Sequence, residues 1–159
     1  MRKELYNHND DGNRGKTFER DLKVKLDKAD ELSAAGKIDL HYNRKCIECK
    51  TGSGELGEIG NKMLKGNSLV IYVPVVDMDA PVEKQEGFVL SRDKFIEILS
   101  ELELIRTKTS TRGKLIYSIQ TIWNHKQNKP HSKKKFEALL DALYDNCICT
   151  LEDWVQGLE

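Results

Sequence analysis

Apolar and polar residues follow two different periods along the first half of the chain. From Thr17, apolar residues recur every three or four positions, which predicts an amphipathic helix that ends near Gly36. Residues 37–43 and 45–51 then alternate with a period of two, which predicts the two strands of a tight β-hairpin. On the second strand, Ile47 and Cys49 are expected on one face and the polar residues on the other.

The pattern after the hairpin predicts a second helix and then a buried strand. Leu56, Ile59 and Met63 recur at helical spacing, and Gly66 can terminate that helix. Residues 68–76 form a nearly continuous apolar run rich in Val and Ile. This composition is typical of a strand buried on both faces, often in parallel pairing.

The C-terminal half predicts a strand and a helix, then a further strand and two more helices. Residues 87–90 read as a short strand, residues 107–113 as a loop and residues 114–123 as another strand. The three helices are expected to begin after the N-cap residues Ser91, Ser132 and Thr150.

This order of elements predicts an α/β fold whose core contains helix, β-hairpin, helix and strand, with a mixed central sheet flanked by helices. A length of 159 residues suits a single domain. Residues 1–14 are expected to form a flexible arm, residues 15–76 the core, and residues 77–159 peripheral strands and helices. The last part is expected to be a helical, basic extension.

Composition narrows the class of protein. A third of the residues are charged, at 33%, and no apolar run approaches the roughly 18 residues that a membrane helix needs. The first residues lack the apolar segment of a secretory signal, so a cytoplasmic location without membrane association is expected. The four cysteines are therefore expected to be reduced. Their paired spacing leaves open a four-thiolate zinc site as an alternative.

Charge is distributed unevenly although the net charge is zero. Residues 105–135 contain no acid, so their nine cations give a local charge of +9 and leave −9 for the rest of the chain. Such a segment suits contact with phosphates, although a solvated basic loop explains it equally well. The cations are Arg106, Lys108, Arg112, Lys114, Lys126, Lys129, Lys133, Lys134 and Lys135.

The predicted hairpin brings together residues with metal-binding chemistry. Asp39 and Glu48 lie on adjacent strands and are expected on the same face, where two carboxylates repel unless a cation lies between them. Mg²⁺ prefers oxygen ligands, and the backbone carbonyl of Cys49 would add another. Lys50 is expected on the same face, where it can orient water and offset charge during phosphodiester hydrolysis.

Asp39 followed by Glu48-Cys49-Lys50 resembles the signature of the PD-(D/E)XK nuclease superfamily. Residues 15–20, GKTFER, are similar to the first-helix motif of archaeal-type Holliday junction resolvases, and residues 51–56 resemble a loop in small phage and mobile-element nucleases. The resemblance implies a restriction-endonuclease-like core. It also implies that Glu19 adds an acid to the metal site and that Ser53 contacts substrate phosphate.

We therefore expect a Mg²⁺- or Mn²⁺-dependent endonuclease that cuts DNA. The metal site would contain Asp39, Glu48, the Cys49 carbonyl and Glu19, and Lys50 would act on the attacking water. A resolvase-like enzyme makes two symmetric cuts, so a homodimer is an open possibility. The alternative is a non-catalytic nucleic-acid-binding protein with a degenerate nuclease core. DNA contacts are expected from Ser53, Arg112, Lys126, Lys129, Lys133, Lys134 and Lys135.

Overall fold

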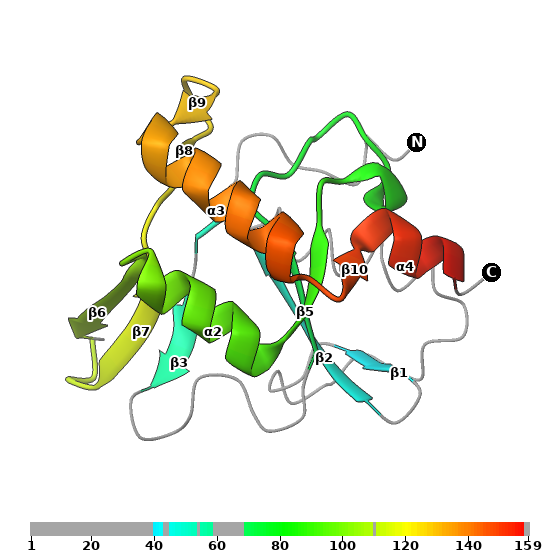
Figure 1. Cartoon of the computed structure of the whole chain (residues 1–159). Coiled ribbons are helices and arrows are strands. Elements are labelled where there is room, and N and C mark those ends of the chain that lie inside the picture. The colour runs from blue at the N-terminus through cyan, green and yellow to red at the C-terminus, as the bar shows by residue number, and fades with distance from the viewer. Residues whose placement is uncertain (1–39, 43–44, 54, 59–68, 110, 158–159) are drawn as a thin grey trace.

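A computed structural model of the chain describes residues 40–42, 45–53, 55–58, 69–109 and 111–157 (Figure 1). The predicted arm over residues 1–14 and the predicted helix after Thr17 lie outside these ranges, as do Glu19 and Asp39. The described residues form two main sheets, a short hairpin and three α-helices.

The larger sheet has five strands in the order β1-β2-β4-β5-β10. Strand β1 (Leu40–Tyr42) pairs antiparallel with β2 (Lys45–Thr51), so the predicted pairing of these two segments is confirmed. Strand β2 runs parallel to β4 (Leu69–Val73), which pairs antiparallel with β5 (Phe88–Ser91). Strand β10 (Cys149–Thr150) completes the antiparallel edge. The sheet is mixed, as predicted.

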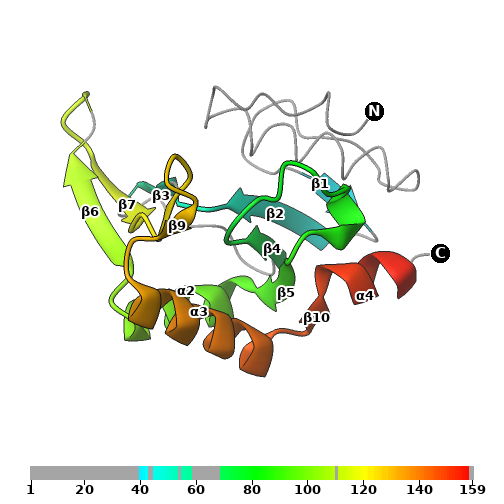
Figure 2. The same cartoon turned by 90° about the horizontal axis from the view of Figure 1, so that it is seen from above.

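Three helices pack around the larger sheet: α2 (Arg92–Glu101), α3 (Lys133–Asn146) and α4 (Leu151–Gly157). Helices α2 and α3 lie along the same side of the molecule, and α4 follows β10 (Figures 1 and 2). Each predicted N-cap side chain accepts a hydrogen bond from a backbone amide near the start of its helix: Ser91 from Lys94, Ser132 from Lys135 and Thr150 from Asp153.

The two faces of the larger sheet contribute to two apolar clusters. Val70 and Tyr72 of β4 belong to a cluster that also contains residues of α2 and α3. Ile71 and Val73 belong to the other cluster, with residues of α4 and of the 3-10 helix η2 (Val82–Lys84). Strand β4 is therefore buried on both faces, as its continuous apolar run predicts.

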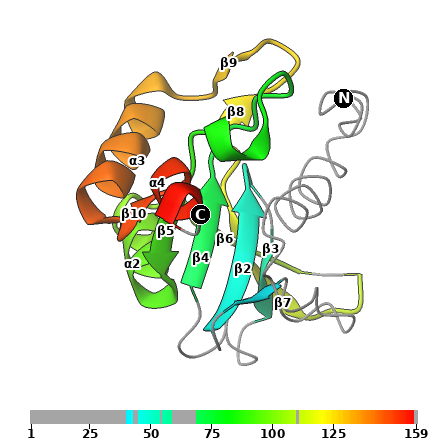
Figure 3. The same ribbon diagram turned by 90° about the vertical axis from the view of Figure 1, so that its right-hand side faces the viewer.

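Beyond the larger sheet, β3 (Glu55–Glu58), β7 (Leu115–Ile119) and β6 (Ile105–Thr109) form a three-stranded sheet in that order. Strands β8 (Trp123–Asn124) and β9 (Lys129–Pro130) form a short hairpin near the start of α3 (Figure 3). No helix in the described ranges has the length and apolarity that a membrane span requires.

Three sequence predictions about these smaller sheets are wrong or incomplete. Leu56 is not in a helix but in β3, where it packs into the cluster beneath α2; the rest of the helix predicted with Ile59 and Met63 lies outside the described residues. The expected loop at residues 107–113 is occupied in its first part by β6, and the single strand expected over residues 114–123 is broken between β7 and β8. Strand β6 lacks an apolar alternation because its side chains are exposed on both faces. The basic part of the expected extension is therefore helical only from Lys133, where α3 begins, and the part before it contains short strands and the segments that connect them.

Candidate functional site

Strand β2 carries Glu48 and Lys50 on one face, because residues two apart along a strand point the same way. Their partners on β4 are Val70 and Tyr72, which both pack into the cluster beneath α2 and α3. Glu48 is only 7% exposed, whereas Lys50 is partly exposed. A carboxylate on a central strand at this depth needs a cation or hydrogen-bond donors to offset its lost hydration.

The opposite face of β2 is apolar, as the alternation predicts. Ile47 and Cys49 are buried and pack with Val82, Leu151 and Val155. This arrangement leaves the polar face of β2 to Glu48 and Lys50. It also means that Cys49 can offer a ligand on the polar side only through its backbone, as the sequence hypothesis requires.

The chain turns sharply just beyond Lys50. Gly52 has φ +57°, a left-handed conformation that favours glycine, and its amide donates to the Val73 carbonyl at 2.9 Å. The Tyr72 hydroxyl donates to the Gly52 carbonyl at 2.7 Å. Burial raises the pKa of Tyr72, so its hydroxyl remains a donor at physiological pH. The backbone that follows Lys50 is thereby fixed to β4.

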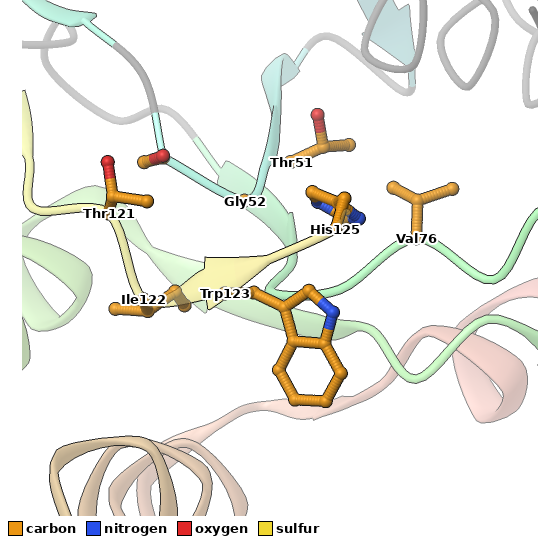
Figure 4. A pocket seen from close by; sticks show the side chains of 8 residues that line it. Thr51, Gly52, Val76, Thr121, Ile122, Trp123 and His125 are labelled. Atoms are coloured by element: carbon orange, nitrogen blue, oxygen red, sulfur yellow. The ribbon is translucent and has the colours of Figure 1, made fainter. Parts of the chain in front are cut away.

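A pocket of about 220 Å³ opens at this turn. Figure 4 shows Thr51 and Gly52 across from Thr121, Ile122 and Trp123, with His125 between Thr51 and Val76. Ser53 also lines the pocket and is exposed, which suits its expected contact with phosphate. Hydroxyls, an imidazole and a backbone turn therefore surround a space next to the strand that bears Glu48 and Lys50.

The β8–β9 hairpin forms one wall of this pocket. Trp123 pairs with Pro130 and Asn124 with Lys129, and the amide of Gln127 donates to the Asn124 side chain at 3.1 Å. The Trp123 ring lies 5.1 Å from that of Phe136 on α3, which favours the core interpretation of this tryptophan over a stacking platform for bases. The Trp123 side chain therefore contacts both the pocket and α3.

His125 is a pocket residue that the sequence interpretation missed. It occupies the loop between β8 and β9, and its side chain lines the pocket together with Thr51. The sequence signal for the turn that carries His125 was the segment from Asn124 to Asn128, because Asn favours tight turns. Asn128 indeed has φ +51° in this loop.

Gln85 fixes the loop that follows Val76. This amide is 3% exposed, and its Nε2 donates to the carbonyls of Asp77 at 2.7 Å and Ala80 at 3.0 Å. Its Oε1 accepts from the Asp77 amide at 2.8 Å. Gln85 is therefore a structural residue. Like Glu48 it is polar and buried, but it carries no charge.

The predicted DNA-contacting cations do not form one patch. Lys126 and Lys129 are exposed on the β8–β9 hairpin beside the pocket, and Lys133 and Lys134 are exposed in the first turn of α3. Arg112 lies in the turn between β6 and β7, at the far end of the three-stranded sheet (Figures 1 and 2).

Two of the lysines at the start of α3 have partners within the chain. Lys135 is partly buried and donates to the side chain of Gln120 at 3.5 Å, which gives both residues a structural role. Lys133 lies 4.0 Å from Glu137, an exposed pair that contributes little to stability.

Two of the four proposed metal ligands belong to the described part of the chain. Glu48 and Cys49 are described, whereas Asp39 and Glu19 lie outside the described residues. Asp39 precedes Leu40, whose partner on β2 is Ile47, the residue before Glu48. Within the described ranges, no three His, Cys, Asp or Glu side chains gather as a metal site.

Among the cysteines whose side chains the structure describes, Cys49, Cys147 and Cys149 are not grouped as ligands of the alternative zinc site; the side chain of Cys46 lies outside this description. Cys147 packs against the cluster beneath α2 and α3, whereas Cys149 packs against the other cluster. Burial raises the pKa of the Cys147 and Cys149 thiols, which disfavours the thiolate form that zinc requires.

No family model matches the chain, and no curated protein or solved structure is significantly similar to it. Its function is therefore inferred from its own residues.

Proposed function

We propose that this protein is a metal-dependent endonuclease that hydrolyses DNA phosphodiester bonds with Mg²⁺ or Mn²⁺. The observation that carries the proposal is the position of Glu48 and Lys50 on one face of β2, whose last residue, Thr51, lines the pocket. An acid and a lysine two residues apart suit phosphodiester hydrolysis because one binds the metal and the other acts on water.

Each residue of the site has a role in this proposal. Asp39, Glu48 and the Cys49 carbonyl would hold the metal, and Glu19 would support it; these are the oxygen ligands that a hard cation prefers. When bound, the metal supplies charge stabilisation on the phosphoryl oxygens. Lys50 orients the attacking water and offsets negative charge that develops on the phosphate.

The pocket supports the substrate side of the proposal. Ser53 can donate a hydrogen bond to a phosphate oxygen, and Lys126 and Lys129 stand on the hairpin that forms a wall of the pocket. Lys133, Lys134 and Arg112 would neutralise more distant phosphates. Lys135 would contribute to DNA binding indirectly, through its hydrogen bond to Gln120. The proposed setting is the cytoplasm, and a homodimer would allow paired, resolvase-like cuts in branched DNA.

A metal titration tests the proposal. The purified chain is incubated with linear duplex, single-stranded and four-way-junction DNA over a range of Mg²⁺ or Mn²⁺ concentrations, with Ca²⁺ as a non-supporting control. We expect cleavage that requires Mg²⁺ or Mn²⁺ and falls by about 10²–10⁴-fold in Lys50→Ala, a typical range for a group that moves or positions a proton. Glu48→Gln should lose cleavage and weaken the metal dependence.

Lys94→Ala is the matched control for Lys50→Ala. Lys94 lies on α2, where it pairs with Glu97 at 3.1 Å on the surface, so its loss should leave cleavage unchanged. If none of the three DNAs is cut with either metal, and Lys50→Ala behaves as the wild type, the endonuclease proposal is wrong. DNA binding without cleavage would then favour the non-catalytic alternative.

A further inference from the structure

The pocket of about 220 Å³ lies at the carboxyl ends of two parallel strands. Strands β2 and β4 pair in parallel and end opposite each other, at Thr51 and Val73. Ser53 lines the pocket just after β2, and Val76 lines it just after β4. Figure 3 shows both strands pointing toward the β8–β9 hairpin, which closes the pocket on its other side.

The chain leaves these two strand ends toward opposite faces of the larger sheet. Strand β3 follows β2, and its Leu56 packs into the cluster beneath α2 and α3. The 3-10 helix η2 follows β4, and its Val82 packs into the cluster on the other face. Where neighbouring parallel strands diverge in this way, a crevice forms at their carboxyl ends, and ligands of α/β proteins bind there. The pocket is therefore placed where this fold would hold a ligand.

The polar side chains that line the pocket can all donate hydrogen bonds, and none of them is an acid. Ser53 and Thr121 present hydroxyls and are exposed, and the Thr51 hydroxyl is partly exposed. The nearest acid along the chain is Asp77, whose carboxylate accepts from the Asp79 amide at 2.9 Å within its own loop. The lining therefore suits a group that is rich in acceptors.

One donor in the lining lacks an acceptor. The Trp123 Nε1 atom is buried and has no hydrogen-bond partner among the described residues. In Figure 4 this nitrogen lies at the edge of the indole ring nearest to Val76. The ring packs 5.1 Å from that of Phe136, which holds its orientation. Buried donors are rarely left unpaired, because an unpaired one has lost its hydration, so an acceptor from outside the chain is expected here.

The charge around the pocket favours an anion. Lys126 and Lys129 are exposed on the β8–β9 hairpin, and Lys134 is exposed in the first turn of α3. The segment from residue 105 to residue 135 contains no acid. A local excess of positive charge raises the concentration of anions near the pocket.

We propose that this pocket binds a phosphate group of DNA, with Trp123 Nε1 and the hydroxyls of Ser53 and Thr121 as donors to its oxygens. An ionised phosphodiester offers acceptors and no donor, which matches this lining. A base is usually held against the face of an aromatic ring, whereas Trp123 packs against Phe136 and presents an N–H group. The phosphate site rests on the proposed function only in taking DNA as the source of the phosphate, and it adds Trp123 and Thr121 as positioning residues.

Trp123→Phe tests the indole donor, because it removes the N–H group and keeps an aromatic ring beside Phe136. Fluorescence anisotropy gives the Kd of a labelled DNA duplex in EDTA, where no metal-dependent cleavage occurs. We expect binding to weaken about tenfold, the usual effect of losing one hydrogen bond to a charged group. In the cleavage assay, KM should rise more than kcat falls, since the indole would bind substrate without acting on the attacking water.

Trp154→Phe is the matched control. Trp154 packs against the other apolar cluster and does not line the pocket, so its replacement should leave the DNA affinity unchanged. Thermal unfolding without DNA should show that Trp123→Phe is destabilised no more than Trp154→Phe. A second pair avoids the core: Thr121→Val should weaken binding about threefold or more, whereas Thr109→Val on β6 should not.

The Trp154→Phe variant also identifies the source of the phosphate, because Trp123 is then its only tryptophan. Its fluorescence is recorded with inorganic phosphate, with a thymidine trinucleotide that carries a 5′-phosphate, with the same trinucleotide without it, and with thymidine. An equal response to both trinucleotides supports a site for a backbone phosphodiester. A response to inorganic phosphate and the 5′-phosphorylated trinucleotide alone supports a site for a terminal phosphate.

The phosphate site is wrong if no phosphate compound changes the fluorescence of Trp123, if thymidine acts as strongly as the trinucleotides, or if Trp123→Phe and Thr121→Val bind DNA as their controls do. These measurements need no divalent metal, so they are independent of the endonuclease assay. Binding that depends on Trp123 without any cleavage would refute the endonuclease proposal alone. Cleavage with an unchanged KM in Trp123→Phe would refute the phosphate site alone.

Discussion

Strands β4 and β6 each contain five residues, but their side chains meet opposite environments. Residues 70–73 of β4 are fully buried between two apolar clusters, whereas residues 106–109 of β6 are all exposed. Strand β4 holds the neighbouring strand β2, with Glu48 and Lys50, in a fixed register. Strand β6 depends on its pairing with β7, and its side chains contribute little to the core.

The comparison teaches where changes in this protein can be tolerated. In the larger sheet, a substitution alters packing on both sides and is expected to affect stability first. In β6, a substitution alters charge and shape at the surface and is expected to change stability little. The following predictions test this division, from the largest expected effect on stability to the smallest.

Phe95→Ala should destabilise the protein by about 3–5 kcal/mol, the usual cost of removing a buried aromatic ring. Phe95 is fully buried on α2, and its ring lies 4.9 Å from that of Tyr72. Leu115→Ala in β7, where the side chain is exposed, is the matched control and should cost less than about 0.5 kcal/mol. Urea unfolding followed by circular dichroism measures both, and equal losses would contradict the division.

Gly87→Ala should destabilise the protein by about 1–3 kcal/mol, the usual range for overpacking. An added Cβ at Gly87 would lie 2.9 Å from Leu151 Cβ and 3.0 Å from Val73 Cγ2. Gly113→Ala, between β6 and β7, is a control that isolates backbone strain, since an added Cβ meets nothing within 4 Å while φ is +78°. Thermal unfolding distinguishes them; a stable Gly87→Ala protein would show that the sheet can shift to make room.

Tyr72→Phe should cost about 1 kcal/mol at neutral pH, because it removes the 2.7 Å hydrogen bond to the Gly52 carbonyl. The substitution should also reduce the decrease in the free energy of unfolding at alkaline pH. Burial raises the pKa of Tyr72 above its ordinary value of 10.0, so the folded state keeps a proton that the unfolded chain releases. The wild type therefore loses stability as pH rises above about 10, and the variant lacks this contribution.

Tyr117→Phe, at a partly exposed position of β7, serves as the comparison for Tyr72→Phe. The free energy of unfolding is measured by urea titration at pH 7, 9, 10 and 11. A steeper alkaline loss in Tyr72→Phe than in the wild type would contradict the role given to burial. In DNA cleavage, Tyr72→Phe should have the larger effect of the two, because Tyr72 fixes the turn beside the pocket.

Local sequence patterns were sufficient to predict the strands and helices that depend on residues close together along the chain. The β1–β2 pairing, the buried strand β4 and the helices capped by Ser91, Ser132 and Thr150 are all confirmed, because alternation and capping act over a few residues. The same alternation placed Ile47 and Cys49 on the apolar face of β2. The acid at Asp39 and the helix with Glu19 remain predictions.

The sequence by itself determined the hairpin, the faces of β2 and the acid-free segment, since each depends on the order of neighbouring residues. Only the tertiary structure decided that Leu56 belongs to a strand, that residues 105–109 form an edge strand, and that His125 joins Thr51 at one pocket. These features depend on pairing between segments distant along the chain. A short polar strand carries no periodic signal until its partner is known.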